Sequence, residues 1–490
     1  MAAAGLIRPS LLAREFLVQD RAQLKIALQS VKAGDAVVLK NGDWTDTQIL
    51  VSAGGETGKP VEVRAETPGG VVLRGSSSLA INAPYVTVDG LLFLGGAIAS
   101  DAVIQFNSHH GIVRATAVVD YNPADFATKY YWVFFRGDDN VLERCYFKGK
   151  NHLEPVVGNE LDDSRRNRVT GCYFKDIPFA QQNGREIIRV WGSGKYEGRD
   201  DDGAFFTIEG NLFDHADGEG AEIISLKSNH NQVLRNTVVA TLGCINIRRG
   251  NFNTVQGNIL LGQGRAGAMG FRMSGEHNLV QGNLAWGCAY GITVSCGEYI
   301  ADALTSGYQP NLKSRGTAKQ NSRVPTYPQN RDVTIADNLM IGNAGPDLEI
   351  GSSYKNHWPE SQQVLLPEAC VIRNNRFVRP AGGVSVAGTV PETAPPFERF
   401  KFQPNRFDGN LLVGGQNSYA PAAAGCVPLK LPLDWSAVLE TAKFKPLTPD
   451  EVGPSWVIAR RKAGDTSLEK PSVISAPTTI SPKKKAKAGN

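Results

Sequence analysis

A short β-rich segment recurs along most of the chain, and its period constrains the fold more than any other sequence feature. The run FTIEGNLFDH at 206–215 returns in variants such as NTVQGNILLG at 253–262 and NLVQGNLAWG at 278–287. Each unit has a short β-rich run, a turn marked by Gly or Asn, and a second short run. Gly and Asn tolerate the left-handed backbone that such corners need. The copies, aligned on one turn position, are marked by Leu91, Cys145, Cys172, Asn211, Asn236, Asn258, Asn283, Asn338 and Asn375.

The spacing of these marks predicts a parallel β-solenoid. The tight spacings are 27, 25, 22 and 25 residues, and the wider ones (54, 39, 55 and 37) fit one coil with an insertion or two coils. One coil cannot bury its own inner face, so coils stack, and an asparagine recurring at one corner can form a ladder of buried amides. A β-propeller needs four strands every ~40–45 residues, which fits worse. An antiparallel sandwich does not explain a repeat of this length.

The segments outside the repeat suggest a domain plan. Residues 20–33 (DRAQLKIALQSVKA) predict a short amphipathic helix, with Asp20 as N-cap and Gly34 as its stop, which caps the open end of the solenoid. We expect an N-terminal extension at 1–15 and a single β-helix catalytic domain at 16–415. A C-terminal extension at 416–464 packs on the solenoid, and 465–490 form a disordered tail.

Composition excludes some partners. No run approaches the roughly 18–20 apolar residues of a membrane span, so we expect no membrane partner. The net charge is only +4, and the one dense basic run, Lys483–Lys487, is best explained as a solvated tail, so we expect no nucleic-acid partner. The seven cysteines show no CxxC pair and are expected to be small buried hydrophobes. The N-terminus lacks an apolar signal core, so the protein is either intracellular, or secreted or periplasmic with its signal absent from this form.

Polar residues concentrate between 183 and 277. Lys227 and Arg248 are 21 residues apart, and Arg248 and Arg272 are 24 apart, about one coil each. We therefore expect these three cations to form a column on one face, at the strand spacing of about 4.8 Å. Stacked like charges favour a bound anion, which indicates an acidic ligand. A solvated, positively charged flank is the alternative. The other members of the cluster are Asn183, Arg185, Glu186, Arg189, Glu219, Glu222, Arg249 and His277.

The elements NGREIIRVWGS, FTIEGNLFDHADGEGAEIISLKS, INIRRGN and GFRMSGEHNLVQGN, in this order, resemble polysaccharide lyase family 6, the family of alginate lyases and chondroitinase B. The N-terminal segment AREFLVQDRAQLKIALQSVKAGDAVVLKNGDW resembles the opening helix and first strand of the family. The resemblance implies a right-handed parallel β-helix. It also implies cleavage of an acidic uronate polymer, with alginate as first choice because most of the family acts on it.

The resemblance also implies residue roles. Lys227 matches the general base, and Arg248 matches the general acid or proton relay. Arg189 and Arg272 match substrate-binding positions, and Arg249 and His277 are further candidates for substrate contacts. A calcium ion is expected on Asn183, Glu222 and Glu219.

Two departures from the family pattern affect these roles. The family reads GE-x-EIIS where this chain reads GEGAEIIS, so Gly220 occupies an expected ligand position and Glu219 is one residue further away. A β-bulge would bring Glu219 back. The family's RHG is RRG here, with Arg249 in place of a histidine, and the extra cation could partly substitute for a metal.

The implied reaction is β-elimination. A base removes the C5 proton beside the uronate carboxylate, the C4 oxygen leaves, and an unsaturated sugar remains. Calcium or arginines must neutralise the carboxylate, and the lysine base must be unprotonated, which neighbouring cations favour. The alternatives are a chondroitin or dermatan sulfate lyase, a uronan C5-epimerase and a non-catalytic polyanion-binding solenoid. A glycoside hydrolase would need paired carboxylates about 5–10 Å apart and would leave the arginines unexplained. The oligomeric state stays open.

Overall fold

The computed structural model describes residues 13–161, 164–192, 202–299, 311–312, 323–324, 327–357, 361–391, 400–429 and 444–470. Residues 1–12 and 471–490, which belong to the predicted N-terminal extension and tail, lie outside this part of the chain, as does the basic run at 483–487. Among the described residues there is no helix with the length and apolar character that crossing a membrane requires.

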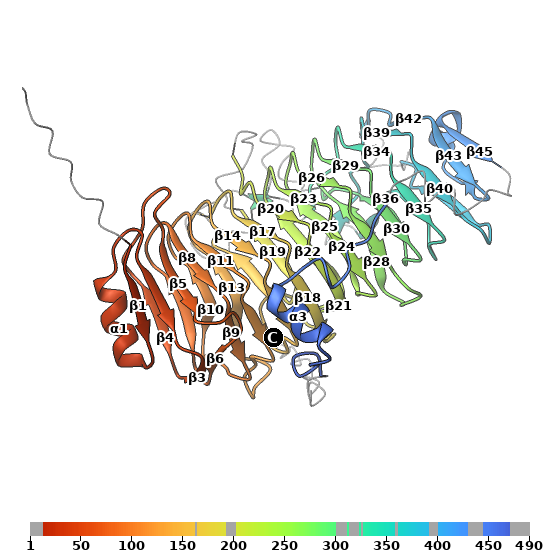
Figure 1. Ribbon diagram of the computed structural model, residues 1–490. Coiled ribbons are helices and arrows are strands. Elements are labelled where there is room, and N and C mark those ends of the chain that lie inside the picture. The colour runs from red at the N-terminus through yellow and green to blue at the C-terminus, as the bar shows by residue number, and fades with distance from the viewer. Residues whose placement is uncertain are drawn as a thin grey trace, which may run out of the picture.

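The chain winds as a right-handed parallel β-helix, which confirms the predicted fold (Figure 1). Each coil contributes one short strand to each of three long parallel sheets, called A, B and C here. Sheet A contains β1 (Glu15–Val18), β2 (Ala36–Leu39), β5 (Val61–Ala65), β8 (Val86–Asp89), β11 (Ile112–Arg114), β14 (Val141–Glu143), β17 (Arg168–Thr170), β20 (Thr207–Glu209), β23 (Gln232–Leu234), β26 (Thr254–Gln256), β29 (Leu279–Gln281), β34 (Thr334–Ala336), β39 (Val371–Arg373) and β42 (Arg406–Asp408).

Sheet B contains β3 (Gly42–Thr45), β6 (Val71–Arg74), β9 (Leu91–Leu94), β12 (Ala117–Val119), β15 (Tyr146–Lys148), β18 (Tyr173–Ile177), β21 (Leu212–Ala216), β24 (Thr237–Val239), β27 (Ile259–Leu261), β30 (Leu284–Trp286), β35 (Leu339–Ile341), β40 (Arg376–Val378), β43 (Asn410–Val413) and β45 (Cys426–Leu429). Sheet C contains β4 (Gln48–Val51), β7 (Ser78–Ile81), β10 (Asp101–Phe106), β13 (Tyr130–Phe135), β16 (Val157–Asn159), β19 (Ile188–Trp191), β22 (Glu222–Lys227), β25 (Gly243–Arg249), β28 (Ala268–Met273), β31 (Ile292–Ser295), β36 (Leu348–Ser352), β41 (Val384–Gly388) and β44 (Gln416–Asn417). Two further pairs, β32 (Asn311–Leu312) with β33 (Arg323–Val324) and β37 (Lys355–His357) with β38 (Ser361–Gln363), complete the strands.

The recurring asparagines stack at the corner between sheets A and B. Asn236 Oδ1 accepts both the backbone N–H and the side-chain amide of Asn211, at 3.0 and 2.9 Å, and Asn258 does the same for Asn236. The ladder continues from Asn283 directly to Asn338, so the 55-residue gap is one coil with an insertion. It satisfies buried polar groups that would otherwise cost free energy at each of these coils.

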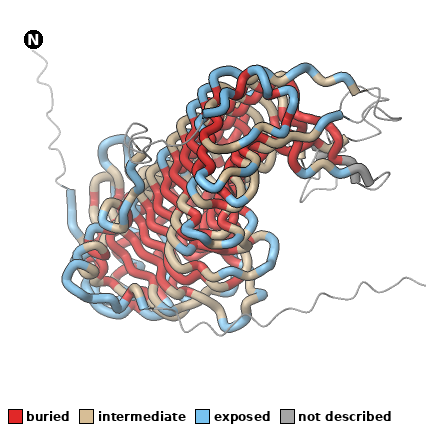
Figure 2. The backbone as a smooth tube through the Cα atoms, turned by 90° about the vertical axis from the view of Figure 1, so that its right-hand side faces the viewer, coloured by how far each residue is buried: buried red, intermediate tan, exposed pale blue. Residues whose placement is uncertain are grey.

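Aromatic side chains stack inside the solenoid in the same way. Phe147, Phe174 and Phe213 lie on successive coils, with ring centroids 5.2 and 4.9 Å apart. Trp132 and Phe135, from the run YYWVFF, are fully buried. Figure 2 shows the buried residues running as one continuous core through the coils. All seven cysteines are buried free thiols.

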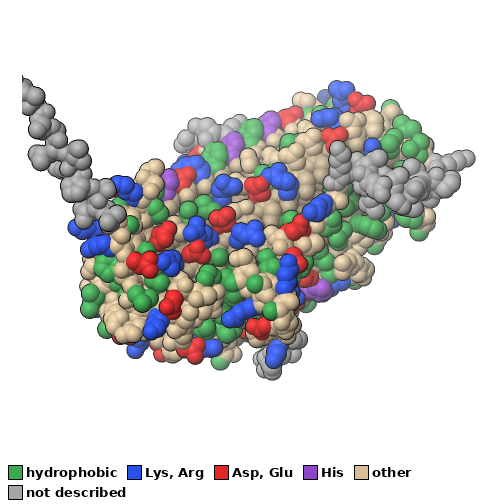
Figure 3. Space-filling view, viewed as in Figure 1, with side chains coloured by type: hydrophobic (Ala, Val, Ile, Leu, Met, Phe, Trp, Pro, Cys, Tyr) green, Lys and Arg blue, Asp and Glu red, His purple; other side chains and the backbone are tan. Residues whose placement is uncertain are grey.

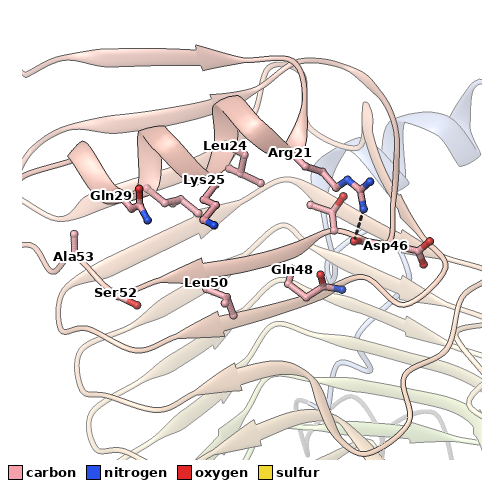
Figure 4. A pocket seen from close by; sticks show the side chains of 11 residues that line it. Arg21, Leu24, Lys25, Gln29, Asp46, Gln48, Leu50, Ser52 and Ala53 are labelled. Atoms are coloured by element: carbon pink, nitrogen blue, oxygen red, sulfur yellow. Dashed lines mark hydrogen bonds between the residues drawn. The ribbon is translucent and has the colours of Figure 1, made fainter.

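Helix α1 (Arg21–Ser30) covers the first coil. Asp20 caps it by accepting a hydrogen bond from the Gln23 backbone N–H at 2.8 Å, and Leu24 and Leu28 pack on the core. The helix ends earlier than the predicted 33, because Val31 is already extended. A groove of about 760 Å³ separates α1 from β4, the edge strand of sheet C (Figure 4).

The last described segment, 444–470, runs back along sheet B (Figure 1). Helix α3 (Ser455–Lys462) places Trp456 against the early coils, where its Nε1–H donates to the Ala115 carbonyl at 2.7 Å. Leu447 and Gly453 bond to Thr237 and Gly171 on the way. Before it, a 3₁₀ turn (Ala420–Gly425) lies at the far end of the solenoid. Acidic and basic side chains are interspersed over the face that α3 crosses (Figure 3).

Candidate active site

The clustered polar residues meet on the outer face of sheet C, where β19, β22, β25 and β28 are neighbours. The register places Arg189, Ser225, Asn246 and Arg272 side by side on successive strands. It places Trp191, Lys227 and Arg249 in a second row.

The expected column of Lys227, Arg248 and Arg272 is therefore wrong. A register shift in the β22–β25 pairing, just before Lys227, places Lys227 beside Arg249, and the register of the β25–β28 pairing places Arg272 beside Asn246. Sequence spacing counts residues along the chain, and a bulge adds one residue without adding a rung.

Three buried carboxylates form the centre of the site. One oxygen each of Glu186, Glu219 and Glu222 lies within 4.8 Å of the other two. Glu222 is bound through its Oε1 by Asn246 at 2.6 Å and by Arg272 at 2.8 Å. Glu186 was part of the sequence cluster but had no predicted role. Its place in the NGREIIRVWGS element, three residues before Arg189 of β19, is a sequence signal that could have marked it.

Glu219 joins this cluster because of the turn that precedes β22. Its Oε2 accepts backbone N–H groups of Gly184 at 2.7 Å and Arg185 at 3.2 Å. Gly220 has a φ of +74°, and a side chain there would lie 2.5 Å from the ring of Phe179. Glycine at 220 thus allows the tight turn. The turn brings the Glu219 carboxylate next to that of Glu222. Burial, with the charges of Glu186 and Glu222, raises the pKa of Glu219 to about 7.

The guanidinium of Arg185 ties together the loops that carry these acids. It donates to the carbonyls of His152, Pro178 and Gly218 at 3.0–3.2 Å. These carbonyls belong to three successive coils, and Gly218 directly precedes Glu219. Burial lowers the pKa of Arg185 to about 10.

Lys227 lies at the end of β22 and points at this cluster. Its Nζ donates to Glu186 Oε1 at 2.8 Å and lies 4.6 Å from the centroid of the Trp191 ring. Burial acts to raise the pKa of Glu186, but the charges of Lys227 and Arg189 outweigh it and hold that pKa below its usual value. Trp191 also lies under Arg249, 5.7 Å from its guanidinium.

Arg248 also lies next to Glu222, with its Nε 3.7 Å from Glu222 Oε1. Its guanidinium carbon lies 3.7 Å from the centroid of Tyr327, an aromatic that the sequence did not single out. Arg248 Nη1 is buried and has no hydrogen-bond partner among the described residues. An unsatisfied buried donor is costly, so an acceptor that reached this nitrogen would be favoured.

Arg189 shares the Glu186 carboxylate with Lys227, whereas His277 lies in different surroundings. Arg189 is buried and bound by Tyr131 at 2.7 Å, Glu154 at 2.9 Å and Glu186 at 3.3 Å. His277 stands at the corner between sheets C and A, stacked on Phe252 with ring centroids 4.8 Å apart, and its Nδ1 is 4.0 Å from Asp332. Its described contacts do not include the three carboxylates.

The donor set fits a hard divalent cation. Three converging carboxylate oxygens are the ligands that Ca²⁺ prefers, and the raised pKa of Glu219 indicates that the cations paired with Glu186 and Glu222 do not offset the burial and the negative charges around it. Asn183 is exposed and lines the same cavity as Glu186 and Lys227. The three clustered carboxylates are thus Glu186, Glu219 and Glu222, with Glu186 added to the set expected from the sequence.

Comparisons with known proteins identify the family to which the chain is similar. The family model described as chondroitinase B matches residues 18–289. The chain is 40% identical to the solved structure of the family 6 polysaccharide lyase Pedsa3628 from Pseudopedobacter saltans, covering 90% of this chain and 99% of that one, with a TM-score of 0.77. The comparison with curated protein sequences finds no match.

More distant solved structures share the fold. The family 6 alginate lyase AlyGC is 23% identical over 90% of this chain and 58% of that one, with a TM-score of 0.75. A mannuronic-acid-specific family 6 lyase from human gut microbiota is 23% identical over 92% and 98%, with a TM-score of 0.72.

Proposed function

The chain belongs to polysaccharide lyase family 6, and we propose that it cleaves alginate by β-elimination at a uronate residue. The observation that carries this proposal is the convergence of Lys227 and Arg248, on neighbouring strands of sheet C, with three clustered carboxylates. Alginate is favoured over other uronates because AlyGC is an alginate lyase and another similar structure is mannuronic-acid-specific.

Lys227 is the base in this proposal. Its amine, once it has lost its proton, takes the C5 proton of the uronate. The ion pair with Glu186 fixes the position of Nζ on the open face of β22. Trp191 covers one side of the ammonium and limits the directions from which a sugar can approach.

Arg248 assists the departure of the C4 oxygen. Its guanidinium is a cation with several N–H donors, so it stabilises the developing alkoxide by charge and by a hydrogen bond. Nη1 is the donor that lacks an acceptor in the described structure. Glu222 and the Tyr327 ring fix the plane of the guanidinium.

The uronate carboxylate must be neutralised before C5 can lose a proton. Glu186, Glu219 and Glu222 would hold a Ca²⁺ ion, which would supply positive charge for that carboxylate. The arginines alone supply less positive charge to the uronate carboxylate, because Arg272 is already bound to Glu222, and Arg189 is bound to Glu186 and Glu154.

The test is the ultraviolet absorbance of the unsaturated uronate product. Purified protein is incubated with alginate, its guluronate-rich and mannuronate-rich blocks, and dermatan sulfate, each with and without EDTA. We expect absorbance to rise with alginate and EDTA to abolish the rise. A rise only with dermatan sulfate would identify a chondroitin or dermatan lyase. No rise would reject elimination, and NMR of the recovered polymer would then separate a C5-epimerase from a binding protein.

A further inference from the structure

A small cavity lies beside Lys227, toward the earlier coils. It has a volume of about 180 Å³ and is lined by Lys129, Gln182, Asn183, Trp191 and Lys227, among others. Its lining residues come from the segment just before β13 and from the coils of β16, β19 and β22, and none comes from β25 or β28. The cavity therefore extends from Lys227 in one direction only.

The cavity suits one sugar residue. Its volume is far above the ~30 Å³ of one water molecule and below the ~300–1,000 Å³ of pockets for drug-sized ligands. The exposed side-chain amides of Gln182 and Asn183 are donors and acceptors for sugar hydroxyls, and Trp191 offers an apolar ring. A uronan chain with C5 of one sugar at Lys227 places the neighbouring sugar here.

The cations of this cavity differ in their availability. Lys227 is paired with Glu186, and Arg189 is held by Glu186, Glu154 and Tyr131. Lys129 is exposed, and in the described part of the chain it forms no ion pair and no side-chain hydrogen bond. It is thus the one lining cation whose charge is not already engaged by a described carboxylate.

The backbone fixes Lys129 at the cavity wall. Lys129 forms a parallel bridge with Leu153, whose neighbour Glu154 binds Arg189. The residue after Lys129, Tyr130, is buried and begins β13. The side chain is therefore flexible while its attachment point is rigid, which suits a cation that binds a charged group on a polymer.

We propose that Lys129 binds the carboxylate of the uronate that occupies this cavity, next to the sugar that loses its proton. This inference rests on the proposed function and assigns one subsite of it. It makes recognition by this subsite depend on the negative charge of the neighbouring sugar. An uncharged sugar of the same shape would leave Lys129 without its partner.

The first test compares steady-state kinetics of Lys129→Ala and Lys129→Arg with the wild type on alginate. We expect Lys129→Ala to raise KM about tenfold with kcat within about twofold, and Lys129→Arg to restore most of the affinity. Lys40→Ala, at an exposed lysine in the early coils, is the matched control and should leave both constants unchanged. A KM for Lys129→Ala within twofold of the wild type would overturn the inference.

A second measurement separates this inference from the proposed reaction. Calorimetric titration of a saturated oligouronate into Lys227→Ala and into Lys227→Ala/Lys129→Ala reports binding without turnover. We expect about tenfold weaker binding by the double variant, and no difference between them for an uncharged β-1,4-linked oligosaccharide of equal length. Equal binding of the oligouronate by both, or no binding by either, would contradict the role of Lys129 even if the wild type forms unsaturated product. If the wild type forms no unsaturated product but the two variants differ tenfold in binding, the proposed reaction is rejected and the role of Lys129 stands.

Discussion

Lys227 Nζ and Glu186 Oε1 are 2.8 Å apart, in a pair whose carboxylate is almost completely buried. The same carboxylate lies in the cluster with Glu219 and Glu222. The candidate base and the candidate metal site therefore share one residue. A cation bound at Glu186 competes with Lys227 for that carboxylate. Cation binding to the carboxylate cluster is therefore coupled to the ion pair that holds Lys227.

Replacing Glu219 by Gln should change how stability depends on pH. Burial and the charges of Glu186 and Glu222 raise the pKa of Glu219 to about 7, against ~4.3 in the unfolded chain. The folded state then binds the proton more tightly, so this residue makes stability fall as pH rises from about 4.5 to 7. The effect is on the order of 3 kcal/mol. In EDTA, Glu219→Gln should exceed the wild type in unfolding free energy at pH 8 and match it at pH 5. Denaturant titrations at both pH values measure this, with Glu56→Gln, at an exposed site, as control. Equal pH profiles for wild type and Glu219→Gln would contradict the account.

Arg189→Met should act mainly on stability. Arg189 is bound by two carboxylates and Tyr131, and its side chain is 6% exposed. Removing one partner of a buried ion pair costs about 3–5 kcal/mol. Arg166→Met, at a residue whose side chain is 51% exposed, should cost less than about 1 kcal/mol. Denaturant unfolding compares the two. A stable Arg189→Met protein with only a raised KM would restore Arg189 as a direct substrate contact.

Gly220→Ala should destabilise the turn that places Glu219. The positive φ costs an L-residue roughly 1–2 kcal/mol, and the new methyl group would meet Phe179 at 2.5 Å. Gly264 has a similar φ of +73° and open space around it, so Gly264→Ala isolates the backbone cost. We expect Gly220→Ala to be the more destabilising of the two and Phe179→Ala to remove the difference. Equal melting temperatures for Gly220→Ala and Gly264→Ala would show that the Phe179 contact is unimportant.

Asn258→Ala should weaken the corner ladder at one coil. Its Oδ1 accepts the backbone N–H and the side-chain amide of Asn236, both at 3.0 Å. Leaving buried donors unsatisfied costs about 1–3 kcal/mol each. Asn258→Thr should lose less, because Thr116 holds the corresponding place in an earlier coil and accepts from Leu91. Calorimetric unfolding of the two variants checks which of them is less stable. An Asn258→Ala protein with the melting temperature of the wild type would contradict the role of the ladder.

The repeat was sufficient to predict the fold because each coil repeats the same local requirements. The stacked turn position at Asn211, Asn236 and Asn258 is visible in sequence because these successive coils carry the same amide at the same corner. The arrangement of the active site was harder to predict from the sequence. Bulges moved Arg248 and Arg272 out of the expected column, and a bulge depends on packing between strands rather than on spacing.

The membership of the carboxylate cluster was also beyond sequence spacing. Glu186 and Glu219 come from different coils and meet because the turn ending at Gly220 folds back against Gly184 and Arg185. Tyr327 reaches Arg248 from 79 positions further along the chain, so no local pattern could connect them. Candidate residues that share one motif could be singled out from the sequence, whereas contacts between loops required the structure.

The most direct test of the central claim is product absorbance on alginate for the wild type and Lys227→Ala, assayed together at matched concentrations. The account predicts a steady rise for the wild type and none for Lys227→Ala, with melting temperatures that agree within a few degrees. Substantial unsaturated product from a folded Lys227→Ala protein would contradict it, because another group would then remove the C5 proton.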